Sequence, residues 1–568
     1  MSQHVVVIGG VALGPKAACR FKRIEPGSKV TMLDMSDLIS YGGCGIPYYV
    51  SGDVPDAEAL RTTAFHMVRD EKFFEDIKGV DVMTRTKATQ VDRENKRVHY
   101  ENVATGETGV LDYDKLVIAT GATPRKLNMP GEDLKGVHYV SNPHDAECIR
   151  ASISQGQVGK AVIIGAGFIG LEMAEAFADM WGVETTVVEI FDQIMPRLVS
   201  PTLARMGMEH MQEKGVEFHL GETVKSIEGD GKVQRVVTDK RTLEADCVII
   251  SVGVIPNDFV AREAGLQCHE RGGIIVDEML RTSDPDIYSG GDCAIIKNLI
   301  TGQPLFLPLG SMANRQGRII GNNLAGGESS FDGAVGSFVV KLFETSLAGT
   351  GLSLEAAEGA GYDAFSVMLT QLDRAHFYPT KELMTLELVV ERGTRKVLGV
   401  QGFGSSGDAM VGRINAVASI LKFKPTIDDI SNLELAYAPP FAAAMDILNT
   451  VANMADNVLR EMNRGVGPAE FEKMWAARES GDFCFIDCRE QPDAQPYMER
   501  NPGHWQNIPQ GEIYKRLDEV PENKTCVLVC NTGARSYEAQ IMLTHKGHKN
   551  VINIHGGMAS LKKYGIEL

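Results

Sequence analysis

The sequence predicts an α/β protein of three or four domains, and three observations support this expectation. The chain has 568 residues, which is too long for a single hydrophobic core. Twice, at residues 4–21 and 160–177, an apolar strand runs into a glycine-rich turn and then a helical pattern. After residue 468 the chain again repeats strand, loop and helix. This alternation is typical of parallel α/β sheets.

Composition and charge narrow the classes of function. The formal net charge of −18 disfavours nucleic acid as a partner. No run approaches the ~20 apolar residues of a transmembrane helix, so we expect no membrane partner. The start, MSQHVVVIGG, enters a strand without a charged leader, which favours a cytoplasmic location. There the ten cysteines are expected to be mostly reduced.

The first strand–turn–helix unit, HVVVIGGVALGPKAACRF, carries an incomplete dinucleotide-binding motif. Val11 stands where the middle glycine is usual, but its neighbours are small enough for the turn to form. Asp34 ends the next strand about twenty residues after the last glycine, where an acid can bind a ribose hydroxyl. The turn residues assigned to the cofactor are Gly9, Gly10, Ala12 and Gly14.

The second unit, KAVIIGAGFIGLEMAEAF, has the complete motif. Gly165 allows the tight turn, Gly167 lets a pyrophosphate approach the backbone, and Gly170 lets the helix pack on the strand. The phosphates would then rest on the helix N-terminus. Glu189 ends the following strand, where it would bind a free 2′-hydroxyl and repel a 2′-phosphate, so we expect NADH rather than NADPH.

Two such units suggest two cofactors, FAD in the first and NADH in the second. LVIATGA, with Thr120 and Gly121, closes the first unit with a strand and a turn. TSDPDIYSGGDCA places Asp292 at a strand end, where it can bind the flavin ribityl and pyrophosphate groups. Gly253 completes the expected cofactor set. The alternative is a single NAD domain with coincidental matches elsewhere.

In combination these motifs resemble the pyridine nucleotide-disulfide oxidoreductases over residues 4 to 455. Members like glutathione reductase carry C-x-x-x-x-C, whereas Ile39 stands five residues before Cys44 here. The chain is therefore similar to the single-cysteine branch, which includes coenzyme A-disulfide reductases, NADH oxidases and NADH peroxidases. The resemblance implies an FAD-binding domain at 1–150 and 280–330, an NADH-binding domain at 151–279 and an α+β dimerisation domain at 331–455.

Cys44, in SYGGCGIPYY, is the predicted reactive thiol. As a thiolate it would attack a sulfur–sulfur bond, keep one half and release the other. The resemblance implies that it faces the flavin and cycles through a mixed disulfide, persulfide or sulfenate. A buried, inert cysteine is the alternative.

Positive charge near this loop suggests a site for coenzyme A. Lys16, Arg20 and Arg23 lie at i, i+4 and i+7 of the first helix and share a face. We expect the adjacent buried face to consist of Ala17, Phe21 and Ile24. In coenzyme A-disulfide reductases, the positions that surround coenzyme A match Lys16, Arg20, Arg23, Ser40 and Lys72. A solvated helix face is the alternative for the charges.

Three positions depart from the family pattern. Gly43 stands where asparagine is frequent, Asn314 where histidine occurs and Met445 where lysine occurs. These departures point to weaker coenzyme A contacts, or to a more open pocket for other persulfides.

The segment LELAYAPPFAAAMDILN, residues 433–449, resembles the family's dimerisation segment. Tyr437 in it and Tyr378 in AHFYP match tyrosines that reach the partner subunit's active site in the reductases. A tyrosine hydroxyl can donate a proton to a leaving thiolate. The resemblance implies a homodimer, and aromatic core packing is the alternative for each tyrosine.

The segment from 468 to 568 resembles a single rhodanese domain. Its motifs are the D-x-R of Asp487 and Arg489, the loop from Cys530 through NTGA to Arg535 and Ser536, and the closing NIHGGM. Backbone N–H groups of residues 531–536 can converge on the Cys530 sulfur at a helix N-terminus, with Arg535 ordering the loop. Such a loop stabilises an anionic persulfide. Tyrosine-phosphatase-like loops are one residue longer than the four residues found here between cysteine and arginine.

Four cysteines of this segment also allow a zinc interpretation. They form two C-x-x-x-C pairs, Cys484 with Cys488 and Cys526 with Cys530. Zinc pairs usually place a thiol on a tight turn, whereas these run through apolar, strand-like segments. We therefore expect no metal site.

Together the two halves predict an NADH-dependent flavoprotein reductase of persulfide or polysulfide, including coenzyme A persulfide or coenzyme A disulfide. Cys530 would handle sulfane sulfur, and Cys44 would attack the persulfide so that hydrogen sulfide and thiol are released. One alternative is an NADH oxidase or peroxidase that cycles through a cysteine sulfenate. Another is a slow sulfur carrier or redox sensor.

Overall fold

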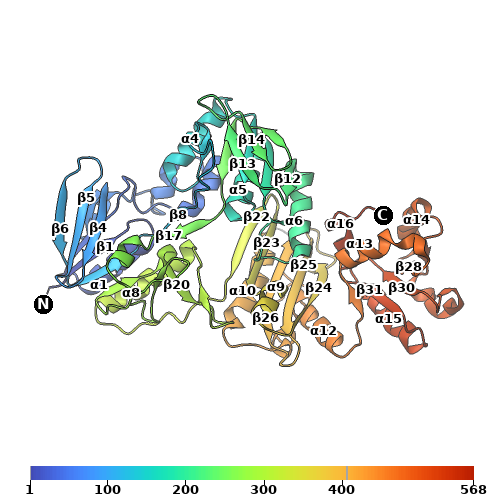
Figure 1. Ribbon diagram of the computed structural model, residues 1–568. Helices are drawn as coiled ribbons and strands as arrows, with labels where there is room; N and C mark the ends of the chain where they lie inside the picture. Colours follow the sequence, from blue (N-terminus) through green and yellow to red (C-terminus); the bar gives the residue numbers. More distant parts are fainter. Residues whose placement is uncertain (1, 405–406) are drawn as a thin grey trace. The chain divides into compact units, whose positions relative to one another are not determined.

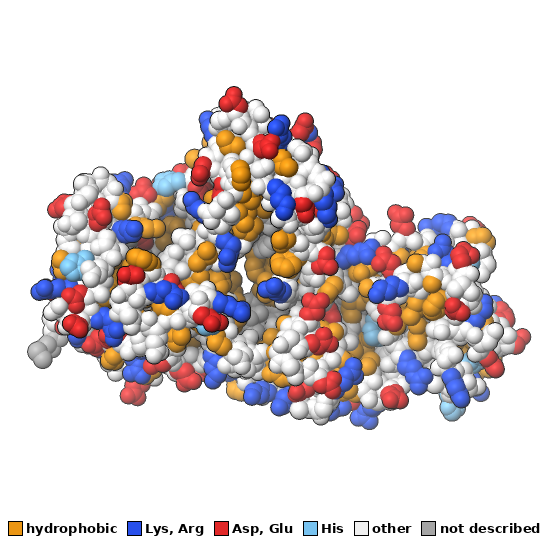
Figure 2. Space-filling model, in the orientation of Figure 1, with side chains coloured by type: hydrophobic (Ala, Val, Ile, Leu, Met, Phe, Trp, Pro, Cys, Tyr) orange, Lys and Arg blue, Asp and Glu red, His pale blue; other side chains and the backbone are white. Residues whose placement is uncertain are grey.

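The computed structural model describes residues 2–404 and 407–568 (Figure 1). It divides into two compact units, Met1–Ile190 with Gly221–Ala334, and Phe191–Leu220 with Val335–Leu568. Among the described residues, no helix is long and apolar enough to cross a membrane. Figure 2 shows basic and acidic side chains interspersed over the visible face.

The first unit contains a five-stranded parallel sheet of order β19-β7-β1-β2-β3. Its strands are β1 (His4–Ile8), β2 (Lys29–Leu33), β3 (Asp81–Met83), β7 (Lys115–Ile118) and β19 (Ile287–Ser289). Both faces of β1 are covered, because its residues alternate between two hydrophobic clusters. One cluster includes helices α1 (Leu13–Ile24) and α8 (Gly310–Leu324). The other includes the antiparallel sheet β4 (Thr86–Asp92), β5 (Arg97–Asn102) and β6 (Thr108–Asp112).

A second parallel sheet in this unit has the order β11-β10-β16-β9. These strands are β9 (Val137–His138), β10 (Lys160–Ile164), β11 (Glu184–Glu189) and β16 (Cys247–Ile250). An antiparallel sheet packs against one face; its strands are β13 (Val224–Glu228), β14 (Arg235–Thr238) and β15 (Thr242–Glu244). Helix α5 (Phe168–Ala178) packs on β10 and β11, and α4 (Pro143–Ser154) precedes β10 in the chain. The predicted pair of strand–turn–helix units is confirmed.

The connections between these two sheets pair with each other. The antiparallel strands β8 (Ala122–Pro124) and β17 (Val254–Pro256) form a two-stranded ribbon. Beside it, Thr120 Oγ1 donates to the Asn257 carbonyl (2.5 Å), and Asn257 Nδ2 donates to the Thr120 carbonyl (2.8 Å).

The second unit contains an antiparallel sheet of order β22-β23-β26-β25-β24. Its strands are β22 (Phe338–Leu342), β23 (Thr345–Gly351), β24 (Ala364–Leu372), β25 (Leu383–Glu391) and β26 (Val397–Gly404). Successive residues of a strand point to opposite faces. Accordingly, Gly402 packs on Met410 of α10 (Gly407–Leu421), while Gln401 donates to the Leu198 carbonyl ahead of α6 (Pro201–Glu213). Helix α12 (Ile447–Leu459) follows.

The end of the chain forms a parallel sheet of order β27-β31-β30-β28-β29. Its strands are β27 (Gly465–Val466), β28 (Phe483–Asp487), β29 (Trp505–Asn507), β30 (Thr525–Val529) and β31 (Val551–Ile554). Its helices are α13 (Pro468–Ala476), α14 (Gln491–Arg500), α15 (Ala534–His545) and α16 (Gly557–Lys563). Aromatic side chains of α13, β28 and β29 stack on one face, and α15 covers the other. The first strand of this sheet, β27, lies just before residue 468, the expected start of the rhodanese-like segment.

This terminal sheet domain is attached to α6 and to the antiparallel sheet. Arg205 of α6 makes two hydrogen bonds to the carboxylate of Glu472 (2.9 and 3.0 Å) and lies over the Tyr564 ring. Lys563 of α16 donates to the Leu383 carbonyl at the start of β25 (2.8 Å). These contacts hold α16, which begins within the NIHGGM segment, against the neighbouring domain.

We expect Arg205→Ala to loosen this attachment. The change removes a bidentate, partly exposed ion pair and a cation–ring contact, together worth about 1 kcal/mol. Limited proteolysis should then cleave the terminal domain away faster than in the wild type. Arg262→Ala, which removes a partly exposed i,i+4 ion pair in the first unit, is the control. Equal cleavage rates in wild type and Arg205→Ala would contradict the contact's role.

Candidate active site

Cys44 lies on the surface of the first unit, in a 3₁₀ turn, Gly43–Gly45, that leads directly into α2 (Ile46–Ser51). A Cβ built on Gly310 would lie 3.5 Å from Cys44 Sγ. Gly310 is the first residue of α8, so the thiol lies at the N-terminus of a fifteen-residue helix. A helix N-terminus presents free backbone N–H groups to a ligand that carries negative charge.

Helix α8 reaches this position because it packs very closely on α1. A Cβ at Gly317 would lie 2.7 Å from the Leu13 carbonyl oxygen, and one at Gly321 would lie 2.7 Å from that of Ala17. Only glycine permits such an approach. The sequence analysis missed this contact, although the spacing of two glycines in GRIIG was available as a signal.

The first cofactor loop is built as the motif predicts. Gly9 has φ +112°, and a Cβ there would lie 2.0 Å from the Ala119 carbonyl oxygen. A Cβ at Gly14 would lie 1.9 Å from the Gly9 carbonyl oxygen. The Asp34 carboxylate accepts the Gly10 N–H (2.6 Å), and its burial raises its pKa. The turn forms although Val11 replaces the usual glycine. Its geometry is suited to binding a nucleotide phosphate at the start of α1.

The second loop repeats this geometry. Gly165 has φ +105°, and a Cβ at Gly170 would lie 1.9 Å from the Gly165 carbonyl oxygen. A Cβ at Gly167 would meet no heavy atom within 4 Å, so the backbone there is open to a ligand. Buried Glu189 accepts the Ala166 N–H (2.7 Å). Each acid therefore holds its own glycine turn by accepting a backbone N–H.

The remaining cofactor candidates lie at strand ends and turns. Asp292 is in the turn after β19, where burial raises its pKa to about 6. Gly121 and Gly253 have φ of +67° and +97° and flank the β8–β17 ribbon. Thr120 binds Asn257 through its side chain, so its hydroxyl is engaged within the protein.

The predicted basic face is only partly free. Arg20 Nε donates to Asn322 Oδ1 of α8 (2.5 Å), whereas Lys16 and Arg23 are exposed. Lys72 is exposed and forms an ion pair with Asp76. The expectation that Ile24 is buried was wrong: it ends α1 and is 37% exposed, because the last turn extends beyond the core.

Ser40 and Asn314 lie on segments that frame the cysteine loop. Ser40 is buried with φ +51°, a conformation that is strained for a residue with a Cβ, and its N–H donates to the Gly10 carbonyl. It thus ties the cysteine loop to the first cofactor loop. Asn314 lies one turn into α8 and donates to the Gly310 carbonyl (2.9 Å).

Glu172 is a candidate that the sequence analysis missed. It lies on α5 directly after the second glycine motif, and Tyr48 of α2 donates to its carboxylate (3.4 Å). Burial raises the pKa of Glu172 to about 7. The contact links the helix that follows Cys44 to the helix that follows the second cofactor loop. The signal was a glutamate inside the apolar run FIGLEMAEAF.

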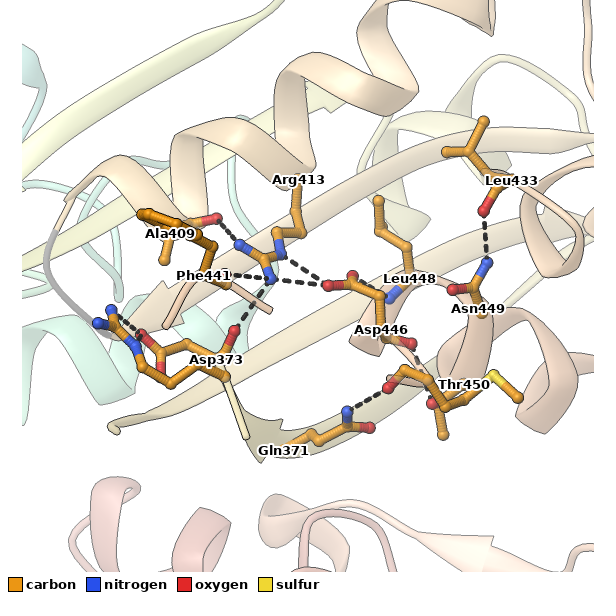
Figure 3. A network of polar contacts seen from close by, with 12 residues as sticks. Gln371, Asp373, Ala409, Arg413, Leu433, Phe441, Asp446, Leu448, Asn449 and Thr450 are labelled. Atoms are coloured by element: carbon orange, nitrogen blue, oxygen red, sulfur yellow. Dashed lines mark hydrogen bonds and ion pairs between the residues drawn. The ribbon is translucent and has the colours of Figure 1, made fainter. Parts of the chain in front are cut away.

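In the second unit, Tyr378 and Tyr437 are carried by neighbouring loops. Arg413 of α10 holds both loops: it donates to the Asp446 carboxylate (2.7 Å) and to the Asp373 carbonyl (2.9 Å) (Figure 3). Asp446 in turn caps α12. Tyr378 is half-buried and Tyr437 is 51% exposed.

The loops that carry Tyr378 and Tyr437 also carry exposed apolar side chains, namely Phe377, Phe441 and Met445.

The loop after β30 encloses the Cys530 sulfur. The Gly533 N–H donates to Sγ (3.2 Å), as does the Ser536 hydroxyl (3.4 Å). The Gly533 φ of +100° turns the chain into α15. Gly557 of the NIHGGM segment closes the other side, since a Cβ there would lie 2.3 Å from the Cys530 carbonyl oxygen. Two donors on one sulfur fit an anionic sulfur species.

The D-x-R residues form a buried ion pair next to this loop. Arg489 Nη2 donates to Asp487 Oδ2 (2.7 Å), which also accepts the Trp505 indole N–H (3.1 Å). Asp487 ends β28 beside β30, so the pair supports the strand that carries Cys530. Arg535, at the second position of α15, is half-buried.

Comparisons with known proteins agree with this architecture. Residues 3–316 match the pyridine nucleotide-disulphide oxidoreductase model, 338–448 the dimerisation domain of that family and 470–564 the rhodanese-like domain. The chain therefore belongs to the pyridine nucleotide-disulphide oxidoreductase family, is an oxidoreductase, and ends in a rhodanese domain. This confirms the predicted resemblance and fold class. The family's cofactors, FAD and NAD(P)H, suit the two glycine loops described above.

Three similar proteins have informative names. The NAD(P)H sulfur oxidoreductase (CoA-dependent) of Pyrococcus abyssi is 35% identical over 80% of this chain and 98% of its own length. The structure of an NAD-dependent persulfide reductase from A. fulgidus is 39% identical, with a TM-score of 0.92 over 98% of this chain and 99% of that one. That of reduced Bacillus anthracis CoADR-RHD is 30% identical, with a TM-score of 0.89 over 99% and 98%.

We expect Glu172 to make the first unit less stable as pH rises. The folded state keeps the proton to about pH 7, while the unfolded carboxyl releases it near 4.5, so stability falls between these values. The loss amounts to at most about 3 kcal/mol. Glu172→Gln should abolish this loss and raise the urea midpoint at about pH 8, with little change at about pH 5.

Exposed Glu263→Gln in the same unit is the control for this experiment. If Glu172→Gln kept the pH dependence of the wild type, another group would be responsible for it.

Proposed function

We propose that this chain is an NADH-dependent persulfide or polysulfide reductase. The observation that supports this most strongly is the exposed, unpaired Cys44 thiol at the N-terminus of α8, in a chain that also carries a rhodanese loop around Cys530. The net reaction would convert NADH, a proton and a persulfide RSSH into NAD⁺, the thiol RSH and hydrogen sulfide. FAD, when bound, supplies the two-electron transfer between NADH and the thiol site.

The residues of the chain would act in the following order. Cys44, as the thiolate, attacks the outer sulfur of RSSH and forms its own persulfide while RS⁻ leaves. Tyr378 and Tyr437 are proposed to donate a proton to the leaving thiolate from the partner subunit of a homodimer. Two electrons and a proton then release the extra sulfur as sulfide and restore the Cys44 thiolate.

Homodimer formation is supported by the exposed apolar side chains around these tyrosines. Phe377 is 64% exposed and Phe441 is 73% exposed, and both adjoin loops held by Arg413. Exposed aromatic residues of this kind are typical of interface cores. The sequence match of 338–448 to a dimerisation domain points the same way.

The choice of nucleotide and of carrier is also part of the proposal. Glu189 is buried at the end of β11, and one of its carboxylate oxygens accepts a hydrogen bond from the glycine turn. The 2′-phosphate of NADPH would meet this fixed negative charge, so we propose that NADH is preferred. Exposed Lys16 and Arg23 offer charge for the phosphates of coenzyme A, and Arg20, Ser40 and Lys72 complete the proposed set. Cys530 would accept or deliver sulfane sulfur. We place the enzyme in the cytoplasm.

The experiment is NADH oxidation without oxygen, with glutathione persulfide or coenzyme A persulfide, and with sulfide assayed in parallel. We expect one sulfide per NADH in the wild type, as the net reaction requires. Cys44→Ser should lose essentially all of this activity, whereas Cys530→Ser should keep activity towards a small persulfide that reaches Cys44 directly. Cys148→Ser, which removes an exposed thiol outside both sites, is the control.

Persulfide-dependent activity that survives Cys44→Ser would overturn the proposal. NADH consumption that requires oxygen rather than persulfide would identify an oxidase instead.

A further inference from the structure

The terminal domain contains a second pair of thiols at the end of its sheet opposite the Cys530 loop. Cys484 on β28 and Cys526 on β30 are direct partners in the parallel register. Both side chains point to the α15 side of the sheet and belong to one hydrophobic cluster. Cys488 and Cys530 follow four residues later, roughly 13 Å further along the strands. The pair is therefore separate from the rhodanese loop.

The two thiols are free and interact with each other. Adjacent strands lie about 4.8 Å apart, which is within the Cα separation of a disulfide. The Cys484 thiol has Gln506 Oε1 as a neighbour (3.6 Å), and the Cys526 thiol donates to the Pro521 carbonyl (3.3 Å). Hydrogen bonding with Cys526, aided by Lys524, lowers the pKa of Cys484, and the same contact raises the pKa of Cys526.

A cavity gives access to one member of the pair. It has a volume of about 740 Å³ and is lined by Cys484, Arg478, His504, Gln506, Arg516 and Lys524. This size is typical of small-molecule sites. Cys526 is fully buried behind Cys484. The arrangement thus has an accessible thiol that ionises more readily and a resolving thiol that solvent does not reach.

We propose that Cys484 and Cys526 form a redox-active dithiol that reduces the sulfur–sulfur bond of a small anionic disulfide or persulfide bound in this cavity. The Cys484 thiolate attacks RSSR, forming a mixed disulfide with RS and releasing RS⁻. The Cys526 thiol then attacks Cys484 Sγ, which forms the Cys484–Cys526 disulfide and releases RSH. With RSSH in place of RSSR, the products are one RSH and one hydrogen sulfide. Two molecules of a small thiol regenerate the dithiol and become a disulfide.

Lys524 is the residue that links the cavity to an anionic ligand. It is half-buried directly before β30 and lines the cavity, and its positive charge helps to lower the pKa of Cys484. Arg516 is already neutralised by Glu512 and Glu519, and His504 is paired with Glu479. A carboxylate-bearing ligand would therefore meet Lys524 beside the thiol it reacts with.

The test uses the full chain with Cys44→Ser and Cys530→Ser, so its result does not depend on the proposed reductase activity. The protein is treated without oxygen with glutathione disulfide, blocked with an alkylating agent and mapped by mass spectrometry. We expect Cys484 and Cys526 to be lost to alkylation together and recovered as one disulfide-linked peptide pair without glutathione. Exposed Cys148 should carry glutathione, and buried Cys247 should remain free, which reports that the fold is intact.

Further variants in this background separate the two roles. With Cys526→Ser, Cys484 should stop at the mixed disulfide with glutathione; with Cys484→Ser, Cys526 should stay unmodified. Lys524→Glu should slow the reaction several-fold, whereas exposed Lys515→Glu, outside the cavity, should not. A second arm with glutathione persulfide should release one sulfide more per chain than the same background with Cys484→Ser, because exposed Cys148 reacts in both.

Reaction with glutathione disulfide alone would show that the ligand is a disulfide, and reaction with glutathione persulfide alone would show that it is a persulfide. If Cys484 and Cys526 stay free in both arms while Cys148 reacts, the proposal is overturned. Failure of Cys526→Ser to trap glutathione on Cys484 would overturn it as well.

Discussion

The close packing of α8 on α1 is the contact on which the first site depends. Helix α1 begins at the first cofactor loop, and α8 begins at the Cys44 thiol. Two glycines, Gly317 and Gly321, bring the helix backbones so near that any Cβ would collide with a carbonyl oxygen. Because the two helices cannot slide freely, the nucleotide loop and the thiol are held in one fixed relation.

The same unit uses buried carboxylates to fix its loops. Asp34 and Glu189 each accept a backbone N–H of a glycine turn, so the acid that would bind a ribose also shapes the phosphate-binding turn. A buried carboxylate is costly unless it is hydrogen-bonded, and here the backbone supplies the donor. Burial also raises the pKa of Glu172, to about 7, although the Tyr48 hydroxyl donates to its carboxylate. Its partner Tyr48 joins the cysteine loop to the second nucleotide loop.

Local motifs were the part of the fold and site that the sequence could predict. The glycine turns depend on residues that lack a Cβ, and the Cys530 loop depends on a short strand–loop–helix segment. Both features are defined within a few residues, and the structure has them as expected. Contacts between distant segments were not readable. The approach of Gly310 to Cys44 depends on packing across the chain, as does the hydrogen bond from Arg20 of the predicted basic face to Asn322. The pairing of Cys484 with Cys526 required the register of two strands.

The central claim is that Cys44 receives sulfur directly from the substrate. The most direct measurement is to mix the enzyme with glutathione persulfide without NADH, block it with an alkylating agent and map the Cys44 peptide by mass. The account predicts one additional sulfur on Cys44, which disappears when NADH is added before blocking. An unmodified Cys44, in enzyme that still releases sulfide at the normal rate once NADH is supplied, would contradict it.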